Sequence, residues 1–160
     1  MKKTKAKQII LILLIIINCV TIFTFSSQKA DESSGTSSRV VDFVIKTAYK
    51  NKNLSSEEEL HIREKLTTPV RKGAHFSVYL CLGLLTYLFT RTLNNVEGKR
   101  KIGYALAFCF LYACSDELHQ IFVPGRSGEM RDIIIDTCGA FTGIVIATII
   151  IGIKDKKIKQ

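Results

Sequence analysis

The sequence lacks the motifs of the common soluble enzymes that use nucleotides or an activated serine. It contains no glycine-rich phosphate loop, no dinucleotide-binding fingerprint and no Gly-x-Ser-x-Gly elbow. It also lacks a Cys-x-x-Cys pair, and its 5 cysteines all lie within apolar stretches. An odd number of cysteines in such surroundings argues against a disulfide framework or a zinc knuckle and indicates packing residues. We therefore expect neither a cofactor nor a bound metal.

The apolar residues make up 47% of the 160 residues and are gathered in four runs. The runs cover residues 9–25, 73–90, 102–123 and 133–153. Each is close to the roughly 20 residues that an α-helix needs to cross a bilayer. The third run meets this requirement only if protein neighbours tolerate its polar end. The sequence therefore predicts an all-α fold, a polytopic membrane domain over residues 9–153 with four transmembrane helices.

The first apolar run follows a cluster of lysines, as the apolar part of a signal peptide does. These are Lys2, Lys3, Lys5 and Lys7. The run is long for a signal peptide, however, and no small-x-small cleavage site follows it. We favour an uncleaved membrane anchor over a signal peptide.

Acidic residues are scarce, 14 against 23 basic residues, and the positive charge is unevenly placed. If the N-terminus is cytoplasmic and four helices cross, the inner segments hold twelve basic and two acidic residues. The much longer outer segments hold eleven basic and nine acidic residues. This positive-inside pattern predicts a plasma-membrane protein with both basic termini, residues 1–8 and 154–160, in the cytoplasm. Lysines there also attract anionic inner-leaflet lipid, so the net charge of +9 needs no nucleic-acid partner.

The expected outer loop, residues 26–72, has two stretches with helical signals. In the first, Ser38 suits an N-cap and apolar residues recur at helical spacing, at Val40, Val41, Val44, Ile45 and Ala48. In the second, Ser55 and Glu58 form a capping box, and Pro69 is expected to end the helix that they open. Two short amphipathic helices on the outer membrane surface fit this pattern. A solvated loop remains the alternative.

Ionisable residues stand at similar depths in three of the expected membrane helices. We estimate the height of each residue along its helix from the basic residue at the cytoplasmic end, with a rise of about 1.5 Å per residue. His75, Asp116 and Asp136 then lie roughly 22–27 Å above those basic residues, near the outer edge of the hydrocarbon core. Ionisable groups at membrane depth are costly and by default indicate a functional site.

Helical spacing groups the polar side chains of this level on shared faces. Residues three or four positions apart are the sets Asp116, His119 and Gln120; Asp132 and Asp136; and His75 and Tyr79. Basic residues flank these helices at Arg71, Lys72, Arg126 and Arg131. A basic ring around carboxylates and imidazoles suits a phosphate or carboxylate head group, because guanidinium binds these anions bidentately.

A purely structural role is the alternative for each member of this cluster, since polar contacts between membrane helices are common. In such a structural role, Asp132 would form an ion pair with Arg126 or Arg131, and Asp116 would form one with Lys72 or His75. We favour function for the cluster as a whole. The Gly139-x-x-x-Gly143 spacing, by contrast, predicts a close-packing face of the last helix.

Four motifs in order make the chain resemble the VanZ-like membrane proteins. They are Phe25-Ser26-Ser27-Gln28, Arg71-Lys72-x-x-His75-x-x-x-Tyr79, Ser115-Asp116-Glu117-x-His119-Gln120-x-Phe122-x-Pro124-x-Arg126 and Asp132-x-x-x-Asp136-x-x-Gly139-x-x-x-Gly143. Together they cover the chain from about residue 25 to residue 145. The resemblance departs at Asp136, where family members commonly carry asparagine. That departure favours hydrogen bonding or a protonated carboxyl there over a fixed negative charge.

The resemblance implies a polytopic plasma-membrane protein associated with lowered glycopeptide susceptibility, especially to teicoplanin. Its implied ligand-binding residues are Arg71, Lys72, Gln120, Arg126, Asp132 and Asp136, with Ser27, Gln28 and Tyr79. The partner would be the bilayer itself and a lipid-linked cell-wall intermediate or the lipid tail of teicoplanin.

Two mechanisms fit these residues best, and two others less well. The first is binding, carried by the basic ring. The second is a membrane enzyme acting on an outer-leaflet lipid head group. There His119 or His75 would be general base or nucleophile, and Asp116 or Glu117 would orient it. A metal site built from His75, Asp116, His119 and Asp132 has no compact motif to support it. Transport is disfavoured because four helices leave little room for alternating access.

Overall fold

The computed structural model describes residues 2–28, 30–50 and 54–158, and within these ranges it contains five helices and no strand. The helices are α1 (Lys2–Ser26), α2 (Ala30–Ala48), α3 (Ser56–Thr90), α4 (Lys99–Gln120) and α5 (Met130–Ile158). The all-α prediction is confirmed. Parts of the two basic terminal segments, residues 1 and 159–160, lie outside the described residues.

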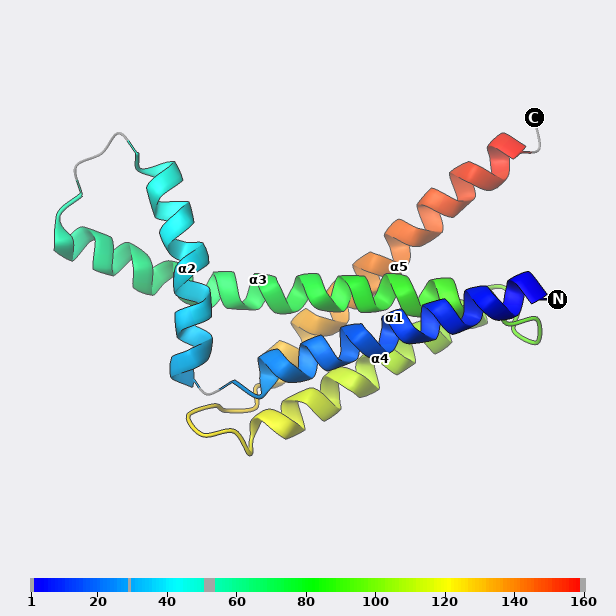
Figure 1. The fold of residues 1–160 in the computed structure, drawn as a ribbon, viewed down its shortest axis with the longest axis horizontal. Helices are drawn as coiled ribbons and strands as arrows, with labels where there is room; N and C mark the ends of the chain where they lie inside the picture. Colours follow the sequence, from blue (N-terminus) through cyan, green and yellow to red (C-terminus); the bar gives the residue numbers. More distant parts are fainter. Residues whose placement is uncertain (1, 29, 51–53, 159–160) are drawn as a thin grey trace.

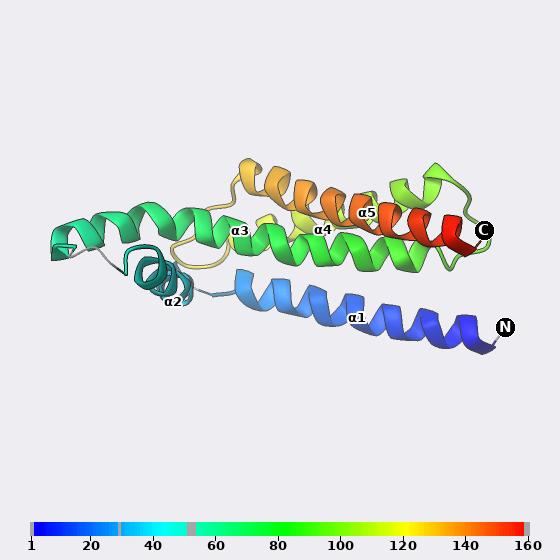
Figure 2. The ribbon, with the colours of Figure 1, turned by 90° about the horizontal axis from the view of Figure 1, so that it is seen from above.

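Helix α3 is the centre of the fold and contacts all four other helices. α1 lies along one side of its second half and α5 along the other, with α4 completing the bundle (Figure 1, Figure 2). The first half of α3 extends beyond the bundle, where α2 packs across it (Figure 1). α1 begins and α5 ends at the same end of the bundle (Figure 2).

Within the described residues, three helices are long and apolar enough to cross a membrane. They cover Thr4–Ser26, Ser56–Thr90 and Met130–Asp155. The sequence-based count of four is therefore not confirmed, and α4 is the exception. Lys99 to Lys101 and the acids Asp116 and Glu117 leave an uncharged stretch of only residues 102–115 between them. This stretch is shorter than the about 20 residues that a spanning helix needs.

The prediction that Pro69 ends a helix is wrong, because α3 runs through it. A proline inside a helix removes one backbone hydrogen bond and crowds the preceding turn. Here neighbouring packing holds the helix on both sides of it. On the N-terminal side, Val41 and Ile45 of α2 are buried and Asp42 pairs with Arg63 of α3. The amphipathic stretch around Val40 is thus confirmed as a helix, although α2 begins well before Ser38.

The capping box that opens α3 is confirmed. The Glu58 amide donates to Ser55 Oγ at 3.3 Å, and the Ser55 amide donates to Glu58 Oε2 at 2.9 Å. We expect Ser55→Ala to destabilise the first turn of α3 by about 1 kcal/mol, because an amide loses its partner. Hydrogen exchange in residues 56–60 should then speed up about fivefold. Ser56→Ala, which leaves the box intact, is the control, and equal exchange in both variants would contradict the role of Ser55.

Glycines bring α3 and α5 into backbone contact, as the Gly139-x-x-x-Gly143 spacing predicts. A Cβ on Gly139 would lie 2.4 Å from the Phe76 carbonyl oxygen, and one on Gly143 would lie 2.0 Å from that of Leu80. Gly83 on α3 faces back, with its Cβ position 2.0 Å from the Ala140 oxygen. This close approach fixes α3 and α5 side by side and so determines where their polar side chains meet.

The core lies on the inward faces of the bundle. Its larger cluster consists of Ile22, Tyr79, Leu82, Cys109, Ala113 and Ala140. Cys109 is buried and Cys19 packs against this cluster, as expected for packing cysteines, whereas Cys81 and Cys138 are exposed. Large apolar residues are exposed along α1 and α5, as on helices whose outer faces contact lipid.

Candidate functional site

The polar residues singled out from the sequence gather at one end of the bundle, which we call the polar end. It is formed by the C-terminal turns of α1 and α4, the middle of α3, the α4–α5 loop and the first turns of α5. The basic residues Arg91 and Lys154 line a hollow at the opposite end, together with Lys7. The chain therefore separates a polar site from a basic surface along the length of its helices.

Gln120 connects the two acids of α4. Its Nε2 donates to Asp116 Oδ2 at 3.3 Å and to Glu117 Oε1 at 3.2 Å. Asp116 Oδ2 also accepts from the Ser26 hydroxyl of α1 at 2.8 Å. Each of the three α4 side chains is only 4% exposed. The acids are thus held inside the bundle by neutral donors, and their orientation is fixed.

Arg126 closes this network from the α4–α5 loop. It donates to Gln120 Oε1 at 3.0 Å and to the Phe25 carbonyl at 3.4 Å. Burial, followed by the neighbouring Arg71 guanidinium, lowers the pKa of Arg126 below its usual value. The turn that aims Arg126 inward requires a positive φ at Gly125, which is 77°. The Pro124-Gly125-Arg126 segment is therefore a positioning turn for one guanidinium.

Lys72 pairs with Asp132 at 2.6 Å and with Glu129 at 3.4 Å. The structural alternative from the sequence, in which Asp132 pairs with Arg126 or Arg131, is therefore wrong. Likewise Asp116 hydrogen-bonds Ser26 and Gln120 and forms no ion pair with Lys72 or His75 in the described structure. The reason lies in the loop. Glu117 accepts from the Glu129 amide at 2.9 Å, and this contact holds the start of α5 beside Lys72.

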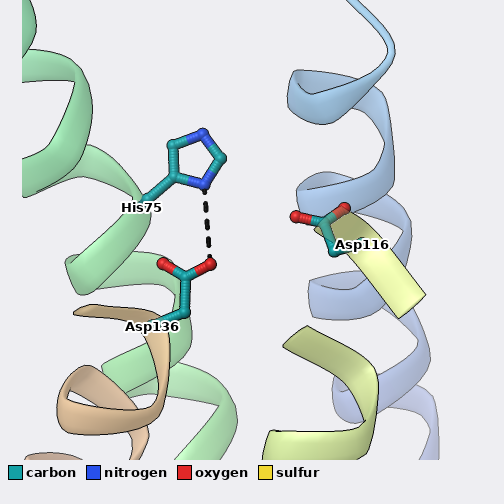
Figure 3. Close-up of side chains that lie close together, drawn as sticks. All are labelled: His75, Asp116 and Asp136. Atoms are coloured by element: carbon teal, nitrogen blue, oxygen red, sulfur yellow. Dashed lines mark ion pairs between the residues drawn. The ribbon is translucent and has the colours of Figure 1, made fainter. Parts of the chain in front are cut away.

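His75, Asp116 and Asp136 converge from three helices (Figure 3). His75 Nδ1 lies 4.0 Å from Asp136 Oδ2, and Asp136 is 0% exposed. Among the described residues, neither oxygen of Asp136 has a hydrogen-bond partner, nor do His75 Nδ1 and the hydroxyl of the buried Tyr79. Of the two expectations for Asp136, hydrogen bonding or a protonated carboxyl, the described residues provide no partner for the first. His75 and Asp136 thus lie next to Asp116 of the Gln120 network, with ligand atoms of the three side chains within 4.8 Å of one another.

His119 lies apart from this group, at the side of α1. Its Nε2 is 3.1 Å from Ser27 Oγ, and its ring stacks on Phe23 with 4.6 Å between centroids. Ser27 Oγ also donates to the Phe23 carbonyl at 2.7 Å. Within the described part of the chain, Asp116 and Glu117 make no hydrogen bond to His119, because both point toward Gln120. The structure thus separates two histidines that helical counting alone placed at one level.

Two cavities meet at the polar end, and both are lined by Arg71, His75 and Arg126. The polar one, of about 220 Å³, is also lined by Gln120, Gly125, Ser127, Glu129 and Asp132. The other, of about 100 Å³, is mostly apolar and is lined by Ile22, Phe25, Ala74, Val78, Gln28 and Ser37. Arg131 is exposed and lines neither cavity. The basic ring is thus reduced to two arginines beside His75.

Sequence reasoning missed Ser26, which holds Asp116, in favour of its neighbours Ser27 and Gln28. The signal was present in α1. Leu11 and Ile22 are buried, Ile15 and Cys19 pack against the core, and Ser26 continues their spacing of three and four residues. Glu129, which anchors the start of α5, had no comparable signal because it lies in a loop.

A family model described as VanZ/LLP1 matches residues 10–151 of the chain. The matched range contains the whole polar end and all but the first turns of α1 and the last turns of α5. No curated protein and no solved structure matches the chain.

Proposed function

Because the chain belongs to the VanZ/LLP1 family, we propose that it acts in the response to glycopeptide antibiotics, teicoplanin above all. In this proposal it binds a cell-envelope lipid, or a lipid-linked head group, at its polar end. The polar end faces the outer leaflet of the plasma membrane, and both termini are cytoplasmic. The basic residues at the other end, with Arg91 and Lys154 beside Lys7, support this orientation by the positive-inside rule.

One observation carries the proposal, namely that a polar and an apolar cavity share Arg71, His75 and Arg126. An amphiphile needs such a pair of neighbouring environments. Its anionic head would contact the two guanidiniums, which bind phosphate or carboxylate with paired hydrogen bonds. Its apolar part would run past Ile22 and Val78 toward the lipid. Arg71 forms no ion pair with any described residue, so its charge is available for such a head group.

Antibiotic susceptibility tests the proposal. The full chain is expressed in a sensitive Gram-positive host, beside an empty vector and an Arg71→Gln/Arg126→Gln double variant. We expect the wild type to raise the inhibitory concentration of teicoplanin more than that of vancomycin. We expect the double variant, at equal membrane abundance, to match the empty vector. A wild type that changes neither concentration would refute the antibiotic response, and an active double variant would refute the arginine site.

The contact between Ser27 and His119 favours a second candidate, a membrane enzyme that acts on a lipid head group. His119 Nε2 is within reach to take the hydroxyl proton of Ser27. Ser27 Oγ would then bond to the phosphorus of a phosphate-ester head group and displace the ester alcohol, to which His119 would return the proton. The hydroxyl must first turn away from the Phe23 carbonyl, to which it donates at 2.7 Å. No carboxylate of the described residues hydrogen-bonds His119, so only the stacking on Phe23 and the contact with Ser27 itself position its ring. Binding is the better supported function for this reason.

The two candidates differ in what they require of Ser27 and His119. If the chain only binds, Ser27→Ala and His119→Gln leave teicoplanin tolerance unchanged in the same assay. If the chain is an enzyme that uses Ser27 and His119, each single substitution lowers the reaction rate by a factor of about 10²–10⁴. Each variant then loses teicoplanin tolerance.

A further inference from the structure

We propose that His75, Asp116 and Asp136 form a binding site for one divalent transition-metal ion of the zinc class. The three side chains come from α3, α4 and α5, and their ligand atoms all lie within 4.8 Å of one another (Figure 3). One imidazole nitrogen and two carboxylate oxygens are a donor set that suits zinc or manganese better than magnesium or calcium. The site differs from the one considered from the sequence, since it excludes His119 and Asp132 and includes Asp136.

Unsatisfied buried atoms point to a ligand at this position. Both carboxylate oxygens of the fully buried Asp136 and His75 Nδ1 have no hydrogen-bond partner among the described residues. The buried Tyr79 hydroxyl is unsatisfied as well. Buried polar groups in folded proteins are nearly always paired, and an unpaired carboxylate is especially costly. A proton on Asp136 could complete one hydrogen bond, whereas a cation between the three side chains satisfies both carboxylates and the imidazole together.

The surrounding charge favours a cation. The charged groups that act most on Asp136 are the carboxylates of Asp116, Glu117 and Asp132, opposed by the ammonium of Lys72. Lys72 is itself paired with Asp132. The two positive charges of a metal ion would add to those of Lys72 and Arg126, which act on the same group of carboxylates.

The geometry is that of a nearly assembled site. Bond lengths of about 2.0–2.1 Å around a tetrahedral zinc ion put neighbouring ligand atoms about 3.3–3.5 Å apart. Side-chain rotations that move the atoms by about 1 Å are sufficient to reach this arrangement. Asp116 is already oriented by Ser26 and Gln120, as metal ligands usually are by their neighbours. Three protein ligands leave one position open, and His75 also lines the polar cavity, from which water or an anion oxygen could enter.

Metal binding by the purified full chain tests the site. The wild type in detergent is stripped with a chelator and titrated with Zn²⁺, and Co²⁺ absorption reports the ligand set. We expect about one Zn²⁺ per chain, and Asp136→Asn and His75→Gln to weaken binding at least about tenfold. Asp132→Asn is the matched control on α5, because Asp132 pairs with Lys72 outside the site. His61→Ala and His119→Ala control for adventitious binding at the other two histidines.

The outcomes are decisive in either direction. Loss of the cobalt spectrum in Asp136→Asn and His75→Gln, with helix content retained and the control variants unchanged, supports the site. The site is refuted if the wild type binds no metal, or if binding survives both substitutions and disappears with His61→Ala or His119→Ala. If one of the other ligand variants fails to fold, Asp116→Asn replaces it, and the same loss of the cobalt spectrum is expected. None of these readouts depends on antibiotic tolerance, so the site and the proposed function can fail separately.

Discussion

Replacing Gly143 with alanine is expected to lower the melting temperature by about 10 °C, because the added methyl group separates α3 from α5. Its Cβ would lie 2.0 Å from the Leu80 oxygen, 2.9 Å from the Leu80 carbonyl carbon and 3.0 Å from the Leu84 nitrogen. All three atoms belong to the α3 backbone, so no side-chain rotation relieves the overlap. The whole helix must move, which costs about 3 kcal/mol in lost packing, the upper end for an overpacked core.

Gly152→Ala is the matched control, since it makes the same substitution on the same helix. Nothing lies within 4 Å of a Cβ at Gly152. The substitution there gains helix propensity worth up to about 1 kcal/mol and meets no opposition. We expect the control to be as stable as the wild type or slightly more stable, by thermal unfolding of the detergent-purified chain. Equal melting temperatures for the two variants would show that α3 and α5 do not touch at Gly143.

The sequence predicted the bundle well where one physical signal dominates. Long apolar runs identified α1, α5 and the second half of α3, and the Gly139-x-x-x-Gly143 spacing identified the contact face of α5. The prediction that Pro69 ends a helix was wrong because it considered only the helix-breaking tendency of proline. Packing of α2 against the first half of α3 outweighs that tendency. For α4 the sequence predicted a membrane-spanning helix that the structure does not confirm. Its apolar stretch lies within the bundle, but charged residues at both ends leave it too short to be identified as a membrane span.

The members of the polar end were predicted more successfully than their partners. Depth counting placed His75, Asp116 and Asp136 at one level, and they do meet. Depth counting could not show that Asp132 forms its ion pair with Lys72 and not with an arginine, because that pairing depends on the conformation of the α4–α5 loop. Nor could it separate His119 from His75, since a rise along the axis says nothing of the direction in which a side chain points.

Arg126→Ala is expected to weaken binding of an anionic lipid by about 10–100-fold, while Arg131→Ala changes it less than about twofold. Arg126 lines both cavities, and Arg131, five positions later, lines neither. Burial and Arg71 lower the pKa of Arg126, so its charge is held at an electrostatic cost that a bound anion would offset. A charge-assisted hydrogen bond of this kind contributes about 1.5–3 kcal/mol, which sets the expected factor. Arg131 can attract anions only through solvent.

Native mass spectrometry of the full chain with phosphatidylglycerol or phosphatidylcholine measures this difference. The wild type is expected to retain the anionic lipid selectively. Arg126→Lys should give an intermediate affinity, because it keeps the charge and loses the paired hydrogen bonds that a guanidinium makes. This variant also controls for stability, since Arg126→Ala leaves the Gln120 oxygen and the Phe25 carbonyl without their donor. If Arg131→Ala weakens binding as much as Arg126→Ala, the chain attracts anionic lipid by its surface charge alone. The lipid is then not bound in the two cavities.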